Sequence, residues 1–160
     1  MSILLDAALS AIAALPMNQR LMALDLGSKT IGVATADYTR QFATPRHTIA
    51  RTKFTADAKS LIEFAAKENI GLIVLGLPLN MDGSEGPRCQ STKTFARNFS
   101  KLSPLPIIFW DERLSSFEAE QQMIEAGLRH EKRQANIDKL AAAIILQGLL
   151  DCLRRAYSNA

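Results

Sequence analysis

The spacing of apolar residues changes several times along the chain, and each change predicts a different element. Between Ile3 and Leu15 the apolar residues recur every three or four positions, which predicts a short amphipathic helix. Three extended segments joined by short polar turns come next, at residues 20–26, 30–35 and 44–49. Consecutive strands with short connections pair antiparallel, so we expect a three-stranded meander.

The second half of the chain alternates helical spacing with short, continuous apolar runs. We predict helices at 54–65, 89–102 and 115–126, a last helix capped by Asn136, and buried strands at 70–77 and 106–110. A meander followed by strand and helix units forms a mixed five-stranded sheet with helices on both faces and right-handed crossovers. The predicted class is therefore α/β, with the layout of a ribonuclease H-like fold.

The chain has the pattern of a single domain, because no repeat, low-complexity tract or Gly/Ser linker divides it. We assign residues 1–160 to this domain, with a helical extension at 1–19 and the ribonuclease H-like core at 20–155. Its 160 residues, 48% of them hydrophobic, are enough for one packed core. The extension either covers this core or contacts another subunit.

Composition excludes several classes of protein. No stretch reaches the roughly 18 uncharged apolar residues of a membrane span, and the N-terminal segment lacks the basic start of a signal peptide. Cys89 and Cys152 have no metal-binding or redox spacing, so we expect a cytoplasmic protein without a membrane anchor. The net charge of +3, from 19 basic and 16 acidic residues, permits an acidic partner without requiring one.

Asp25 is the first candidate for chemistry, because it lies near the end of an apolar strand. A buried carboxylate needs a cation, hydrogen bonds or a metal to offset the loss of water. The alternative is that Asp25 accepts backbone N–H bonds from the turn at 27–29.

Two acidic residues, Asp111 and Glu112, and then Arg113 follow the last predicted strand, where open α/β sheets bind ligands. Because side chains alternate across a strand, Asp111 and Glu112 face opposite ways, and only one is expected to share a site with Asp25. The alternative is a polar strand exit with Glu112 and Arg113 in solvent.

Asp138 lies on the inward face of the last helix, three, four and seven positions before Ala141, Ala142 and Ile145. The alternative is a favourable interaction with the helix dipole, typically worth about 0.3–1 kcal/mol. Asp25, the acids after the last strand and Asp138 are expected to meet at one end of the sheet. An oxygen-rich site of this kind suits Mg²⁺ or Mn²⁺.

A long loop rich in Gly and Pro covers residues 76–87. Its glycines are able to offer backbone N–H groups to a phosphate, and Asn80, Asp82 and Glu85 are its candidate site residues, with Asp82 or Glu85 completing a metal shell. The alternative is an ordinary surface loop with a turn at 80–83.

Basic residues recur at four-residue spacing on the helix after this loop, at Lys93, Arg97 and Lys101. Like charges at this spacing repel, and an anionic partner relieves the repulsion, although a solvated helix face is the commoner explanation. Further basic residues that we expect to contact nucleic-acid phosphates or to extend the patch are Lys29, Arg88, Arg113, Arg129, Lys132 and Arg133.

Four segments of the chain match the motifs of one known family. They are LDLGSKTIGVA at 24–34, the loop at 76–88, DERLSS at 111–116, and IDKLAA at 137–142 followed by ILQ at 145–147. Over residues 21 to about 153 the sequence resembles the YqgF family, also called RuvX, of RuvC-like nucleases. The resemblance implies a cytoplasmic bacterial protein of ribonuclease H-like fold, described as a nuclease that processes the 5′ end of precursor 16S ribosomal RNA. A Holliday junction resolvase role has also been proposed for the family.

The family motif identifies Asp25 as the first-strand acid, Asp111 and Glu112 as the second acidic element and Asp138 as the helical acid. The expected metal ligands are Asp25, Glu112 and Asp138. Many RuvC-like nucleases have a glutamate near the end of the fourth strand, where this chain has Leu75, Gly76 and Leu77. Glu112, Asp111 and Glu85 therefore remain alternatives for the second acid.

The residues and the resemblance together predict a metal-dependent nuclease that acts on precursor rRNA, with ribosome association. The alternatives are a resolvase-like endonuclease acting on branched DNA and a non-catalytic RNA-binding module. An ATPase-like phosphate binder is disfavoured, because such proteins need two related domains and 160 residues supply one. The sequence leaves open whether the protein is a monomer or a homodimer.

Overall fold

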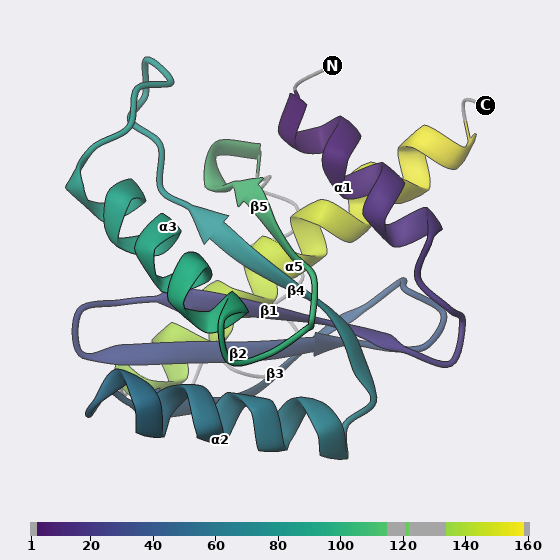
Figure 1. The fold of residues 1–160 in the computed structure, drawn as a ribbon. Helices are drawn as coiled ribbons and strands as arrows, with labels where there is room; N and C mark the ends of the chain where they lie inside the picture. The colour runs from purple at the N-terminus through teal and green to yellow at the C-terminus, as the bar shows by residue number, and fades with distance from the viewer. Residues whose placement is uncertain (1–2, 115–120, 122–133, 159–160) are drawn as a thin grey trace.

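A mixed five-stranded sheet, in the order β3-β2-β1-β4-β5, forms the centre of the protein (Figure 1). The structure, a computed structural model, describes residues 3–114, 121 and 134–158. Its strands are β1 (Arg20–Leu26), β2 (Thr30–Ala36), β3 (Ala43–Ala50), β4 (Ile70–Leu77) and β5 (Ile107–Asp111). β2 pairs antiparallel with β1 and with β3, whereas β4 pairs parallel with β1 and with β5. The predicted meander and mixed five-stranded sheet are confirmed.

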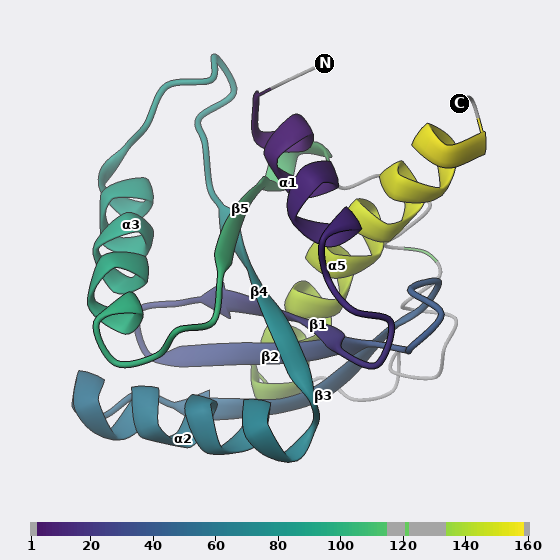
Figure 2. The same ribbon diagram turned by 45° about the vertical axis from the view of Figure 1, so that its right-hand side comes forward.

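Helices cover both faces of the sheet (Figures 1 and 2). α2 (Phe54–Lys67) and α3 (Pro87–Ser100) pack on one face, and α1 (Ile3–Ala13) and α5 (Gln134–Ser158) pack on the other. A short 3₁₀ helix, η1 (Glu112–Leu114), follows β5. Among the described residues no helix has the length and apolar character needed to cross a bilayer.

The start of the last helix differs from the prediction. α5 begins at Gln134, so Asn136 lies inside the helix and the predicted cap is wrong. Gln134 and Ala135 are good helix formers, which explains why the helix extends ahead of the expected cap. The helix predicted at 115–126 falls on residues of which the structure describes only Gln121.

The alternation of side chains along β1 decides which way its acid points. Leu21 and Ala23 belong to the core beneath α1 and α5, and Met22 and Leu24 belong to the core beneath α2 and α3. Asp25 continues the first series, so its side chain is directed toward the face that α5 covers.

A glycine allows α5 to approach the sheet closely. A Cβ atom at Gly32 in β2 would lie 2.0 Å from the carbonyl oxygen of Asp138 and 2.5 Å from its carbonyl carbon. Only a hydrogen atom fits between β2 and the backbone of α5 at this point. Gly32 therefore determines how near Asp138 lies to the sheet.

The N-terminal extension covers the core. Ala8 and Ile12 of α1, and Leu15 after it, are buried together with Trp110 of β5 in one apolar cluster. Of the two roles left open by the sequence, the structure shows the first, because these residues fill the space over β5.

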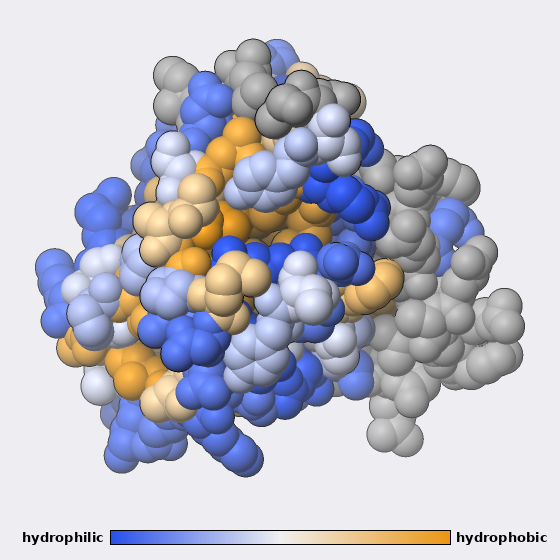
Figure 3. Space-filling model, turned by 90° about the vertical axis from the view of Figure 1, so that its right-hand side faces the viewer, coloured by the Kyte–Doolittle hydropathy of each residue, from blue (hydrophilic) through white to orange (hydrophobic). Residues whose placement is uncertain are grey.

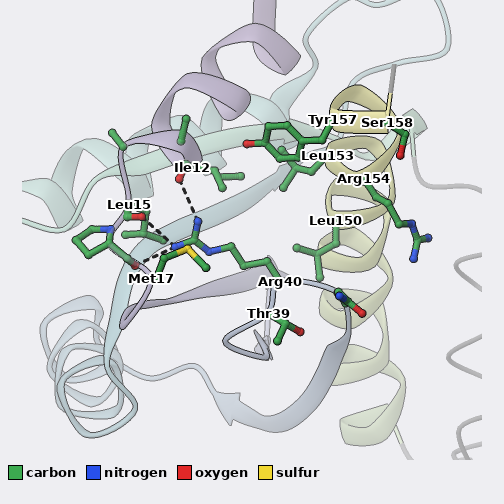
Figure 4. A pocket seen from close by; sticks show the side chains of 14 residues that line it. Ile12, Leu15, Met17, Thr39, Arg40, Leu150, Leu153, Arg154, Tyr157 and Ser158 are labelled. Atoms are coloured by element: carbon green, nitrogen blue, oxygen red, sulfur yellow. Dashed lines mark hydrogen bonds between the residues drawn. The ribbon is translucent and has the colours of Figure 1, made fainter. Parts of the chain in front are cut away.

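Arg40 fastens the end of α1 to the rest of the molecule (Figure 4). Its guanidinium donates hydrogen bonds to the carbonyl oxygens of Ile12 at 3.3 Å, Leu15 at 3.0 Å and Pro16 at 2.9 Å. Beside it, a hollow of about 880 Å³ lies between α1 and the C-terminal end of α5. Apolar residues gather in a hollow on this side of the molecule, with polar residues around it (Figure 3).

Arg40→Ala is expected to lower the free energy of unfolding by about 1–3 kcal/mol, because three carbonyl groups lose a charged donor. The residue has a positive φ of 58°, and alanine keeps any strain there. Arg97→Ala is the matched control, since the exposed Arg97 hydrogen-bonds only Thr94 among the described residues, and it should change the stability by less than about 0.5 kcal/mol. Urea denaturation measures both, and equal effects would contradict the anchoring role.

Candidate active site

Three carboxylates from distant parts of the chain lie at one edge of the sheet. β1, β4 and β5 are parallel, so their carboxyl ends share this edge, with Asp25 near the end of β1 and Glu112 directly after β5. Asp138 arrives from α5, and its Oδ2 accepts a hydrogen bond of 2.5 Å from Thr30 Oγ1 at the start of β2. The two partners are 108 positions apart in the sequence.

Glu112 occupies the space over the end of β4. A Cβ atom at Gly76 would lie 2.6 Å from Glu112 Oε1 and 2.6 Å from Cδ1 of Ile145 in α5. The Glu112 side chain therefore lies between β4 and α5, on the same face of the sheet as Asp25. A side chain at position 76 would displace it.

Asp111 has a different environment. Arg113 donates to its carboxylate from the backbone N–H at 3.0 Å, from Nε at 3.0 and 3.2 Å and from Nη2 at 2.7 Å. The same guanidinium also donates to the carbonyl oxygen of Met81 at 3.2 Å. Asp111 thus holds Arg113, and Arg113 holds the tip of the loop that follows β4.

The surroundings of these acids shift their pKa values in different directions. Burial raises the pKa of Asp25; the nearby Arg88 opposes the rise and Asp138 adds to it. Burial also raises the pKa of Glu112, with added repulsion from Asp25 and Asp111 and an opposing effect of Arg88. By contrast, the hydrogen bonds from Arg113 hold the pKa of Asp111 below its usual range, against the effect of burial. Asp25 and Glu112 therefore interact as neighbours, while Asp111 is neutralised by its own partner.

The turn at 27–29 does not cap Asp25. The Gly27 N–H donates to the carbonyl oxygen of Thr30 at 2.9 Å. No donor within the described residues hydrogen-bonds the Asp25 carboxylate. The turn-cap alternative is therefore wrong in this structure.

The loop residues predicted as site candidates are engaged with one another. Asp82 accepts hydrogen bonds from the Ser84 N–H at 2.9 Å and hydroxyl at 2.6 Å, and Asn80 Nδ2 donates to the same hydroxyl at 2.9 Å. Glu85 forms an ion pair with Lys93 on α3. The structure does not bring Asp82 or Glu85 to the three carboxylates.

The predicted basic residues divide into two groups. Arg88 and Arg113 line a groove of about 560 Å³ together with Glu112, and the exposed Lys29 lies on the turn between β1 and β2.

The second group follows α3 away from this edge and consists of Lys93, Arg97 and Lys101. At a rise of 1.5 Å per residue, Lys101 lies about 20 Å along the helix direction from Arg88. Arg129, Lys132 and Arg133 lie outside the described residues.

Sequence reasoning missed Thr30, Gly32 and Arg51. Thr30 and Gly32 position Asp138, which follows from a contact between distant segments and leaves no local pattern. Arg51 comes directly after β3, whose carboxyl end shares the edge because β3 runs parallel to β1. Its position two residues after the third predicted strand was a signal that pointed to this edge.

The donor set fits a hard divalent cation in its chemistry. Asp25, Glu112 and Asp138 supply only oxygen atoms. Burial is the main cause of the raised pKa values of Asp25 and Glu112, and neighbouring carboxylates add to the rise. Among the described residues no three Asp, Glu, His or Cys side chains are close enough to hold a metal ion as they stand. The site is therefore a group of neighbouring carboxylates and not a closed cage.

Lowering the pH is expected to stabilise the metal-free protein through Asp25 and Glu112. Because both pKa values are raised, the folded state binds more protons than the unfolded state between the ordinary and the raised values, so the free energy of unfolding falls as the pH rises through the raised values. Urea denaturation with chelator, from acid to neutral pH, compares the wild type with the double variant Asp25→Asn, Glu112→Gln. The double variant should lack this fall, and an unchanged pH profile would show that the pKa values of the two carboxylates are not raised in the folded protein.

The architecture matches known structures. RuvC of Thermus thermophilus, solved in complex with a Holliday junction substrate, aligns with a TM-score of 0.58 and 11% identity over 89% of this chain and 98% of its own. The yeast mitochondrial Holliday junction resolvase Ydc2 aligns with a TM-score of 0.53 and 14% identity over 96% and 88%. At such low identities the likeness concerns the fold alone, which is ribonuclease H-like.

The sequence matches narrow this class to one family. The family described as "RuvX: Holliday junction resolvase" matches residues 19–152, and the chain belongs to this family. A "Putative pre-16S rRNA nuclease" of Rhizobium meliloti (strain 1021) is 52% identical over 139 residues, which cover 87% of this chain and 84% of the relative. A protein of the same name from Rhodobacter capsulatus is 57% identical over 141 residues, with 88% and 89% covered. The family resemblance found in the sequence is confirmed.

Proposed function

We propose that the protein is a nuclease that hydrolyses phosphodiester bonds with Mg²⁺ or Mn²⁺ and processes the 5′ end of precursor 16S rRNA. The observation that carries the proposal is the meeting of Asp25, Glu112 and Asp138, from three distant elements, at the edge where such folds bind their ligands. The names of its relatives, at 52% and 57% identity, favour the rRNA substrate. Cytoplasmic location and ribosome association follow from this substrate and belong to the proposal.

The three carboxylates would hold the metal, which supplies Lewis-acid stabilisation of the phosphate and an activated water. Thr30 fixes the orientation of the Asp138 carboxylate through its hydroxyl. Arg88 reduces the repulsion between the acids and offers a guanidinium to the phosphate backbone. Lys29 adds an exposed positive charge at the same edge, and Arg113 adds an exposed guanidinium whose charge is paired with Asp111. Binding should therefore weaken as the salt concentration rises.

The position of the Glu112 side chain favours Glu112 as the second acid of the site. Many RuvC-like nucleases place a glutamate near the end of the fourth strand, where this chain has Gly76. Here the Glu112 carboxylate lies in the space that a side chain at position 76 would fill. We infer that the acid missing from β4 is supplied from the end of β5, and that Asp111 and Glu85 are not ligands.

A four-way DNA junction is the second candidate substrate, because the matching family is described as a Holliday junction resolvase. The test compares cleavage of a precursor 16S rRNA 5′ leader and of a four-way DNA junction, each with Mn²⁺, with Mg²⁺ and with chelator. Asp25→Asn, purified in the same way, controls for a contaminating nuclease.

Metal-dependent cutting of the leader that Asp25→Asn lacks is the expected result. Cutting of the junction alone would assign the resolvase activity. Binding of the leader with no cutting of either substrate would support a non-catalytic RNA-binding module and contradict the proposal.

A further inference from the structure

A second hollow lies at the same edge of the sheet, on the side that α3 covers, between the β1–β2 turn and the start of α3. Its volume is about 430 Å³. Leu26 and Phe95 contribute apolar surface to it, and Ser28 and Ser91 contribute hydroxyl groups. The positive charge of the hollow comes from the guanidinium groups of Arg51 and Arg88. None of the described residues that line the hollow is acidic.

Arg51 is held in the wall of this pocket, and among the described residues only one nitrogen of its guanidinium has a hydrogen-bond partner. Its Nη1 donates to the carbonyl oxygen of Gly27 at 2.6 Å, and its backbone N–H donates to that of Lys29 at 2.8 Å. Within the described residues the Arg51 guanidinium forms no ion pair. A carbonyl partner fixes the group without neutralising its charge.

Arg88 adds a second charge to the pocket. It is exposed, and in the described part of the chain no carboxylate lies within ion-pair distance of it. Both guanidinium groups line the same hollow, so an anion bound there interacts with two positive charges. Phosphate suits them best, since guanidinium groups bind its oxygen atoms in pairs and the two serine hydroxyls donate further hydrogen bonds.

The pocket shares Arg88 with the candidate active site. The same residue lines the groove that contains Glu112 and acts electrostatically on both Asp25 and Glu112. A nucleic-acid strand bound with one phosphate at the acids therefore has a cationic pocket within reach of a neighbouring phosphate.

We propose that the pocket of Ser28, Arg51, Arg88 and Ser91 binds a backbone phosphate one or two nucleotides from the bond that the acids cut. This inference rests on the proposed nuclease function and adds to it a subsite that sets the position and polarity of the strand. Because the contacts are to phosphate alone, the subsite selects no base.

Arg51→Gln tests the subsite, with Lys67→Gln as the matched control. Lys67 is exposed at the end of α2 and its exchange removes the same charge far from the pocket. On the leader RNA, Arg51→Gln should raise KM about tenfold with kcat changed less than twofold, which corresponds to the loss of one charged contact. Lys67→Gln should leave both constants unchanged.

A second variant keeps the test valid if Arg51→Gln does not fold. Ser91 is exposed in the first turns of α3, so Ser91→Glu should fold normally while it places a negative charge at the pocket. It should raise KM at least as much as Arg51→Gln. A KM equal to the wild type in both variants would overturn the proposal.

Single methylphosphonate substitutions along the strand identify the phosphate involved. Binding is measured by fluorescence anisotropy with chelator present, so that the strand is not cut. At one position the neutral linkage should weaken binding to the wild type about tenfold. The same linkage should not weaken binding to Arg51→Gln any further. Additive effects at every position would overturn the subsite. Failure of the nuclease proposal appears separately, as a wild type that binds the strand and does not cut it.

Discussion

Asp25→Asn is expected to abolish cleavage while leaving the protein at least as stable as the wild type. The carboxylate has a raised pKa, so its charge destabilises the folded state at neutral pH, and a neutral amide of nearly the same shape removes that penalty. Loss of groups that merely support metal ligands costs about 10- to 100-fold, so loss of a ligand should reduce the rate by more than about 100-fold. Cleavage of the leader with Mn²⁺ and urea denaturation of the same preparation measure both effects.

Asp111→Asn is the matched comparison at the same edge. Its pKa is lowered by Arg113, so the ionised Asp111 stabilises the folded state above its ordinary pKa, and this contribution is lost as the pH falls. The substitution weakens the contacts from Arg113 and should lower the free energy of unfolding by about 1–2 kcal/mol. A loss of stability in Asp25→Asn, or none in Asp111→Asn, would contradict the division of roles between the two acids.

Gly32→Ala is expected to have the largest effect on stability. The new methyl group would lie 2.0 Å from the backbone of Asp138, and backbone atoms of a long packed helix have little freedom to move aside. Overpacking of a core typically costs about 1–3 kcal/mol, and a collision with backbone should exceed that range. The displacement of α5 should also move Asp138 from Thr30 and reduce cleavage in any protein that remains folded.

Gly86→Ala is the control for the general effect of adding a methyl group to a glycine. A Cβ atom there would lie 3.6 Å from the nearest atom, in ordinary contact, and its φ of −99° is accessible to alanine. Thermal unfolding should show a large loss of stability for Gly32→Ala and little change for Gly86→Ala. Similar melting temperatures for the two variants would mean that α5 does not depend on Gly32 for its position.

The sheet and its helices could be predicted because local patterns determine them. The alternation in β1 and the helical spacing of α5 direct Asp25 and Asp138 to the same face, and strand alternation indicated that only one of Asp111 and Glu112 would join them. The identity of that residue depended on the contacts of Arg113, which pair it with Asp111. Sequence spacing carries no information on such a choice.

Contacts between distant segments account for what the sequence did not predict. The bond from Thr30 to Asp138 and the close approach at Gly32 exist only once α5 lies across β2. Glu85 was an alternative acid by composition, but its ion pair with Lys93 directs it to α3. The spacing of the basic residues on α3 could be recognised in the sequence. The cationic pocket could not, because it combines Arg51 with residues from other parts of the chain.

The most direct test of the central claim, that Asp25, Glu112 and Asp138 form one metal-dependent nuclease centre, is the Mn²⁺ dependence of cleavage by Glu112→Gln. Asp82→Asn is the control, because Asp82 is exposed and bound to Ser84. We expect Asp82→Asn to follow the wild-type Mn²⁺ titration, and Glu112→Gln to be inactive or to need far more Mn²⁺. Cleavage by Glu112→Gln with the wild-type rate and Mn²⁺ dependence would contradict the account.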